Sequence, residues 1–171
     1  MKNIVIASPH SLHDQLEIEL GVTFTVTRIK AREALTAEYL KALNPSYVFF
    51  PHWSWIIPDE ILTDFQCVIF HMTDLPYGRG GSPLQNLIVR GKTATVISAI
   101  KCVKELDAGP IYLKMPLTLD GTAKEILDRA STIIQQMIFK IVEGGGELKD
   151  QLGDVVSFKR RVLDDGDLSH L

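Results

Sequence analysis

Residues 67–83 read CVIFHMTDLPYGRGGSP, an apolar run followed at once by a histidine and a loop rich in proline and glycine. The run Cys67–Phe70 is typical of a strand buried on both faces of a sheet, which is the usual state of strands in parallel sheets. Open α/β sheets carry their chemistry where such strands end. His71 therefore marks a candidate site at the end of a buried strand.

The segments on either side alternate between strand and helix patterns. Apolar or alternating runs predict strands at Asn3–Ala7, Thr23–Ile29, Tyr47–Phe50, Cys67–Phe70, Thr93–Ile100 and Ile111–Met115. Capping residues and helical spacing predict helices from Ser11 to Gly21, at Glu33–Leu43, from Pro58 to Thr63, at Leu84–Arg90, and from Thr122 to the glycines at 144–146. This order predicts an α/β class, with a Rossmann-like, largely parallel sheet flanked by helices in a single domain. We expect residues 1–150 to form that domain and residues 151–171 to be a C-terminal tail.

Composition excludes several classes of protein. The chain has 171 residues, 46% of them hydrophobic, and a formal net charge of −3, which fits a globular enzyme better than a nucleic-acid binder. The opening residues read as a first strand rather than a signal peptide, and no window is apolar enough to span a membrane. Cys67 and Cys102 lie within apolar strands and are expected to be buried free thiols. A cytoplasmic location follows from these features.

Two loops carry groups suited to acid–base chemistry. His71 opens the first, and Asp107 lies in the second, within the turn Leu106–Gly109 (LDAG). A histidine and a carboxylate at the carboxyl ends of strands can pass a proton between them. By contrast, the loop that follows the first predicted strand, Ser8–Ser11, lacks the glycines that a dinucleotide or triphosphate site needs. Neither NAD nor ATP is therefore expected.

The residue types of the two loops and their spacing resemble those of the formyltransferase family that uses N10-formyltetrahydrofolate. That family's first loop runs Asn-x-His-x-Ser-x-Leu-Pro, then Arg-Gly and a nearby Pro. Here the matching residues are Ile69, His71, Thr73, Leu75-Pro76, Arg79-Gly80 and Pro83, and the family's Asp-x-Gly is Asp107-Ala108-Gly109. The resemblance implies the formyltransferase fold and is strongest to sugar N-formyltransferases.

The resemblance also implies roles for individual residues. His71 would polarise the formyl carbonyl, and Asp107 would orient His71 and help to accept the proton of the attacking amine; the alternative for His71 is a structural histidine. Thr73, Arg79 and Gly81 would contact the acceptor, although Arg79 could instead order its own loop. The implied folate-binding residues are Trp53, Trp55, Ile56, Ile57, Val103, Lys104, Glu105 and Leu106. For the two tryptophans, core packing is the alternative.

One departure from the family pattern concerns the oxyanion donor. The family's asparagine falls on Ile69, which has no polar group. Thr73, His52 or a backbone N–H are candidates to replace it, because losing such a donor typically costs about 10²–10³ in rate. A metal site built from His52 and His71 is not expected, since no third ligand has suitable spacing.

The implied activity is transfer of a formyl group from N10-formyltetrahydrofolate, as co-substrate, to the primary amine of a nucleotide-linked amino sugar in surface-glycan biosynthesis. Direct attack by the amine needs no covalent enzyme intermediate. The tRNA-modifying branch carries a C-terminal domain that this sequence does not show, so we expect a small-molecule acceptor and neither nucleic acid nor membrane as partner, with a homodimer left open. Alternatives are a formyltetrahydrofolate hydrolase and a non-catalytic folate-binding protein.

Overall fold

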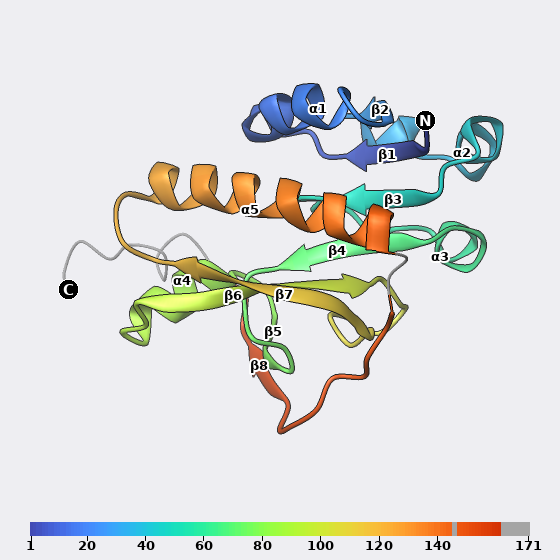
Figure 1. The fold of residues 1–171 in the computed structure, drawn as a ribbon. Coiled ribbons are helices and arrows are strands. Elements are labelled where there is room, and N and C mark those ends of the chain that lie inside the picture. The colour runs from blue at the N-terminus through green and yellow to red at the C-terminus, as the bar shows by residue number, and fades with distance from the viewer. Residues whose placement is uncertain (145–146, 162–171) are drawn as a thin grey trace.

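The computed structural model describes residues 1–144 and 147–161, and a six-stranded sheet forms its centre (Figure 1). The strand order is β2-β1-β3-β4-β6-β7. Strands β2, β1, β3 and β4 pair in parallel, whereas β6 pairs antiparallel with both β4 and β7, so within this sheet β6 alone runs against the others. The predicted α/β class with a largely parallel sheet is confirmed. The strands of this sheet are β1 (Asn3–Ala7), β2 (Thr25–Ile29), β3 (Tyr47–Phe50), β4 (Cys67–His71), β6 (Ala94–Lys101) and β7 (Ile111–Thr118).

Helices cover both faces of the sheet, which explains why its central strands are continuously apolar. In β1, Ile4 and Ile6 pack on the face covered by α1 and α5, while Val5 and Ala7 pack on the face covered by α2 and α3. Figure 1 shows α5 lying along the sheet beside α1. Each fully buried aliphatic side chain contributes about 1.5–3 kcal/mol of hydrophobic free energy. The helices are α1 (Asp14–Leu20), α2 (Ala37–Leu43), α3 (Asp59–Asp64), α4 (Pro83–Val89) and α5 (Ala123–Gly144), with short 3₁₀ turns η1 (Ser11–His13) and η2 (Arg32–Ala34).

The chain order places the carboxyl ends of β1 and β3 where open α/β sheets usually bind their ligands. From β1 the chain moves to β2 on one side and later returns to β3 on the other side, which is the topological switch point of open α/β sheets. The loops after β1, β3 and β4 therefore all open at the same edge of the sheet. Ser8 and His52 lie in these loops and His71 ends β4, so the fold gathers polar side chains at that edge.

A second, two-stranded sheet was not predicted. Strand β5 (Tyr77–Gly80) lies within the glycine-rich loop and pairs in parallel with β8 (Val156–Phe158) from the predicted tail. Figure 1 shows this pair beside the main sheet, at the end of the segment that follows α5. Residues 162–171 of the predicted tail, and residues 145–146 of the predicted glycine stop, lie outside the described residues. The described part of the tail thus returns to the loop that follows His71.

One predicted helix was wrong in its extent. Glu33–Leu43 is divided into η2 and α2, because Thr36 adopts an extended conformation and caps α2, its side chain accepting a hydrogen bond from Tyr39 N at 3.1 Å. Such a cap satisfies one of the free N–H groups at a helix start.

Among residues 1–144 and 147–161, no helix is long and apolar enough to cross a membrane.

A candidate active site beside strand β4

His71 is the last residue of β4 and lies opposite Ser98 of β6 in the sheet. Its side chain is buried, with 8% exposure, and its Nε2 lies 2.7 Å from Gly78 O. A carbonyl oxygen only accepts hydrogen bonds, so Nε2 carries a proton and donates it. The other ring nitrogen, Nδ1, faces the Asp107 carboxylate, with Oδ2 at 3.7 Å. The structure therefore brings together the predicted catalytic pair.

Asp107 lies in a tight turn and is almost fully buried, with 7% exposure. Its backbone is left-handed, with φ 54°, a conformation that aspartate tolerates better than most residues. Its Oδ2 accepts a hydrogen bond from Gly80 N at 2.8 Å, which fixes the carboxylate beside β5. Two residues on, a Cβ at Gly109 would lie 1.8 Å from Lys101 O, so this position must be glycine. The Asp-x-Gly spacing thus has a steric cause.

The loop after His71 is held by its own polar groups. Thr73 is fully buried, and its hydroxyl donates to Gly78 O at 3.2 Å, while Ser98 Oγ donates to Thr73 O at 2.7 Å. Gly78 has φ 79°, and a Cβ there would lie 2.6 Å from Thr73 Cγ2. Thr73 was predicted to contact an acceptor. That contact stays a prediction; in this structure the Thr73 hydroxyl shapes the loop that presents Gly78 O to the His71 ring.

Arg79 and Gly81 both lie against the C-terminal segment. Arg79 donates from Nε at 3.2 Å and from Nη2 at 2.9 Å to Gln151 Oε1, so the structure shows the loop-ordering alternative for this side chain. A Cβ at Gly81 would lie 2.8 Å from Arg160 Cβ, which leaves no room for a larger residue. The roles predicted for these two residues in acceptor binding stay predictions.

Two side-chain amides near the site were missed by sequence reasoning. Gln151 Nε2 donates to Asp107 O at 2.7 Å and to Gly109 O at 2.8 Å. Asn86 Nδ2 contacts three carbonyl oxygens, including Gly81 O at 3.2 Å and Lys159 O at 3.1 Å. Both amides join segments far apart in the chain, and no local pattern signals such contacts.

The segments predicted to bind folate lie close together. Asp59, at the start of α3, forms an ion pair with Lys104 at 3.7 Å, which links the loop after β3 to the loop after β6. Ile56 is 92% exposed and Leu106 is 70% exposed, whereas Ile57 packs into the core. Exposed apolar side chains on adjoining loops are what a flat ring system needs for binding.

Trp53 and Trp55 are both half-buried. Trp53 packs edge-on against Phe50, with ring centroids 5.8 Å apart, and against Trp55 at 4.8 Å. Within the described residues, Trp53 Nε1 is the buried side-chain polar atom without a hydrogen-bond partner. An unpaired buried N–H costs roughly 1–3 kcal/mol, so this atom is suited to a ligand's acceptor group.

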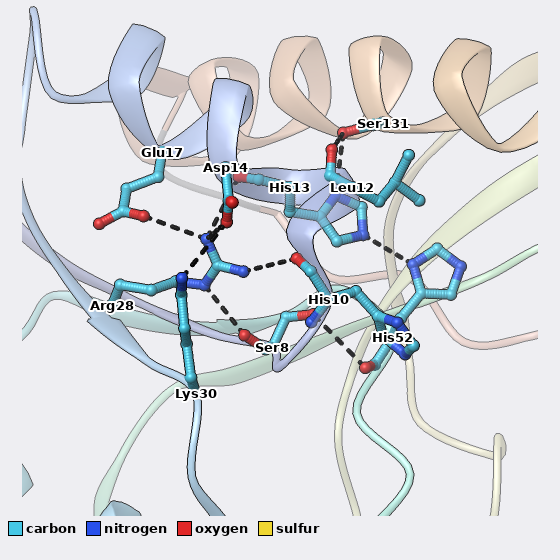
Figure 2. Close-up of polar contacts among 10 residues, drawn as sticks. All are labelled: Ser8, His10, Leu12, His13, Asp14, Glu17, Arg28, Lys30, His52 and Ser131. Carbon is cyan, nitrogen blue, oxygen red and sulfur yellow. Dashed lines mark hydrogen bonds and ion pairs between the residues drawn. The ribbon is translucent and has the colours of Figure 1, made fainter.

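His52 does not join His71 but lies in a separate histidine cluster, which Figure 2 shows. His13 Nε2 lies 2.7 Å from His52 Nδ1, and His13 Nδ1 lies 2.9 Å from Ser131 Oγ on α5. Burial lowers the pKa of His13 to about 3 and that of His52 to about 4, with the neighbouring histidine and Arg28 charges adding to the effect on His13. Both rings are therefore neutral at pH 7.

The loop between β1 and α1 is anchored by Arg28, also drawn in Figure 2. Its buried guanidinium donates to Ser8 O at 3.0 Å and to His10 O at 2.7 Å, and it forms ion pairs at 3.1 Å with Asp14 and Glu17. Arg28 thus satisfies the backbone carbonyls of a loop that lacks regular structure.

No group of three or more metal-binding side chains occurs in the part of the chain that the structure describes.

Ile69 carries no polar group, and in this structure two of the candidates to replace the family asparagine, Thr73 and His52, already have protein partners. Ile69 packs beside the cluster that contains Phe50 and Cys67. The hydroxyl of Thr73 is used by Gly78, and Nδ1 of His52 is used by His13. A backbone N–H remains as the third candidate donor.

Comparisons with known proteins show the family of this chain. The formyl transferase family model matches residues 7–142. A methionyl-tRNA formyltransferase of Thermotoga maritima is 30% identical over 131 residues, which are 72% of this chain and 41% of that protein. The chain thus spans less than half the length of this curated relative.

Solved structures extend the comparison. The methionyl-tRNA formyltransferase from Clostridium thermocellum superimposes with a TM-score of 0.90 at 47% identity, over 95% of this chain and 74% of that chain. The formyltransferase PseJ from Anoxybacillus kamchatkensis, solved with tetrahydrofolate and a UDP-linked formamido sugar, superimposes with a TM-score of 0.70 at 16% identity, over 91% of this chain and 85% of that chain. At that identity the second comparison shows the shared fold alone.

Proposed function

This chain belongs to the formyl transferase family, and on that premise we propose that it transfers a formyl group from N10-formyltetrahydrofolate to a primary amine. The observation that carries the proposal is the buried pair of His71 and Asp107, with Nδ1 and Oδ2 3.7 Å apart. That distance exceeds the usual 2.7–3.2 Å of an N–H···O hydrogen bond. Nδ1 and Oδ2 are therefore not held by a short hydrogen bond to each other, and a third polar group beside them could contact both.

The residues of the pair have complementary tasks in such a transfer. The acceptor amine must lose a proton when it bonds to the formyl carbon, and the folate nitrogen must gain one when its bond to that carbon breaks. Asp107 would hold the amine, take its proton and return that proton to the departing folate nitrogen. Because the Nε2–H of His71 is bound to Gly78 O, the ring would donate to the formyl oxygen from a protonated Nδ1. Gly78 O fixes the orientation of the ring, since it holds Nε2 at 2.7 Å. A fixed donor aimed at developing charge stabilises a transition state more than water does.

The loops beside the pair fit the folate donor, which supplies the formyl group when it is bound. Ile56 and Leu106 present exposed apolar surface, and Trp53 Nε1 is a buried N–H that lacks a partner within the described residues. A pterin has flat apolar faces and hydrogen-bonding edges, so it matches this combination. We assign the loop after β3 and the turn at residues 103–106 to the donor on this basis.

For the acceptor we propose the amine of an amino sugar, because the sequence of residues 71–83 most resembles that of sugar N-formyltransferases. The net charge of −3 supports a small acceptor, because a polyanionic RNA is normally bound by a basic surface. The free thiols Cys67 and Cys102 fit the reducing cytoplasm, where such a nucleotide-linked sugar would be made. A second candidate, the amine of methionyl-tRNA, is favoured by the names of the relatives at 30% and 47% identity.

The acceptor can be identified by mass spectrometry of the product. The protein is incubated with N10-formyltetrahydrofolate and, in parallel, with a panel of nucleotide-linked amino sugars, with methionyl-tRNA, or with no acceptor. Formylation of a sugar with no change in the tRNA supports the proposed acceptor, and the reverse supports the second candidate. Formate release without any acceptor indicates hydrolysis, and an unmodified panel contradicts transfer to these amines.

A further inference from the structure

We propose that Gln151 is a positioning residue for Asp107, so that the segment after α5 completes the site. Its amide makes four hydrogen bonds within the site. Nε2 donates to Asp107 O and Gly109 O at 2.7 and 2.8 Å, and Oε1 accepts from Arg79 Nε and Nη2 at 3.2 and 2.9 Å. A glutamine amide has two N–H groups and two acceptor positions, so this side chain is saturated. Its orientation is also determined, because a flipped amide would turn its NH₂ group to a guanidinium.

The Asp107 turn needs an external contact of this kind. Asp107 has φ 54°, a conformation that is sparsely populated outside glycine and that persists where surrounding structure holds it. Gln151 holds the carbonyls of the first and last residues of the Asp-x-Gly motif, Asp107 and Gly109. The turn also lies close to the carbonyl oxygen of Lys101, and it can do so because Gly109 has no side chain. The backbone direction at Asp107 sets where its carboxylate points, and here it points at His71 Nδ1.

The same glutamine also fixes strand β5, through Arg79. The residues flanking Arg79 make the other two contacts of the catalytic pair, because Gly78 O accepts from His71 Nε2 and Gly80 N donates to Asp107 Oδ2. Gln151 therefore ties the histidine side and the aspartate side of the site to one another. Misplacing reacting groups by about 1 Å can cost about 10²-fold in rate. We therefore assign to Gln151 the role of holding the His71 side and the Asp107 side of the site at a fixed relative position.

This role rests on the proposed formyl transfer, and it predicts a specific kinetic signature. Gln151→Ala should lower kcat about 10- to 100-fold, with the KM values of donor and acceptor changed less than about threefold, because protein groups already occupy every hydrogen-bonding position of the Gln151 amide. Gln151→Glu keeps the shape and the acceptor for Arg79 but loses both donors, and it should show the same loss. The matched control is Gln136→Ala, an exposed glutamine on α5.

Two further measurements separate positioning from general structural support. In an Asp107→Asn background, Gln151→Ala should lower kcat little further, since residues that act as a unit are not additive. In ¹⁵N-labelled protein, the ring nitrogen signals of His71 should shift in Gln151→Glu and stay unchanged in Gln136→Ala. The NMR readout needs no turnover, so it tests the inference even if the wild-type protein transfers no formyl group.

Several results would overturn the inference. It fails if His71 signals are unchanged in the folded Gln151→Glu variant, or if kcat is unchanged in that variant. It also fails if the kcat losses of Gln151→Ala and Asp107→Asn multiply, because each side chain then acts alone. Shifted His71 signals in a protein with no transferase activity would instead support the positioning role and contradict the proposed function.

Discussion

The buried histidine pair His13 and His52 should make the stability of this protein fall steeply in mild acid. Both rings are neutral in the folded state, where burial lowers their pKa values from 6.5 to about 3 and about 4. In the unfolded chain each ring takes up a proton near pH 6.5. Below that pH the unfolded state binds more protons, so the free energy of unfolding decreases as pH falls. The loss begins near pH 6.5 and is complete below the folded pKa values.

The size of the effect follows from those pKa values. Between pH 7 and pH 5, protonation of one unfolded imidazole with a pKa of 6.5 lowers the free energy of unfolding by about 2 kcal/mol, while the folded ring stays neutral. The two rings together contribute about 4 kcal/mol, a large fraction of the total stability of a typical domain. Neighbouring charges include Arg28 and His10, which oppose ring protonation, and Asp14, which favours it, and burial remains the largest influence on both rings.

The test is urea unfolding at pH 7 and pH 5, followed by tryptophan fluorescence, for wild type and His52→Asn. The variant keeps one buried ring, His13, so its loss of stability between the two pH values should be smaller than the wild-type loss by about 2 kcal/mol. Gln136→Ala, on the exposed side of α5, serves as the control and should keep the wild-type difference. An identical pH dependence in wild type and His52→Asn would refute the reasoning.

Other substitutions and modifications test further parts of the fold. Gly109→Ala places a Cβ 1.8 Å from Lys101 O and should lower the free energy of unfolding by about 3 kcal/mol in urea; an unchanged midpoint would show that the turn has room. Arg28→Met leaves loop carbonyls without their donor and Glu17 without its cation, while Asp14 keeps Lys30, and it should cost about 3 kcal/mol in the same assay. Burial raises the pKa of Cys67 to about 12 and of Cys102 to about 11, so neither thiol should react with iodoacetamide at pH 8 until the protein is unfolded, as mass spectrometry would show.

Much of the fold could be predicted because buried strands leave a simple pattern. Runs such as Ile4–Ala7 and Tyr47–Phe50 are apolar at every position, since helices cover both faces of the sheet. His71 and Asp107 could be singled out because each lies in or beside a turn whose glycines have steric causes. Gly109, for example, is required by the nearby Lys101 carbonyl.

The remaining features depend on contacts between distant segments. Strand β5 is short and glycine-rich, so its pairing with β8 leaves no periodic pattern in either segment. Gln151 acts only through hydrogen bonds to residues 42 to 72 positions away. His52 was a candidate for the site of His71, yet its backbone turns to φ 59° and directs the ring to His13 instead. Side-chain direction after a strand depends on such backbone turns, which residue types alone do not determine.

The most direct test of the proposed function is the rate of tetrahydrofolate release from N10-formyltetrahydrofolate, measured with and without amine acceptors, for wild type and His71→Ala. We predict release that depends on one acceptor and that falls by at least about 10²-fold in His71→Ala. Equal rates in the two proteins would contradict the role of His71. Absence of acceptor-dependent release from wild type would contradict formyl transfer itself.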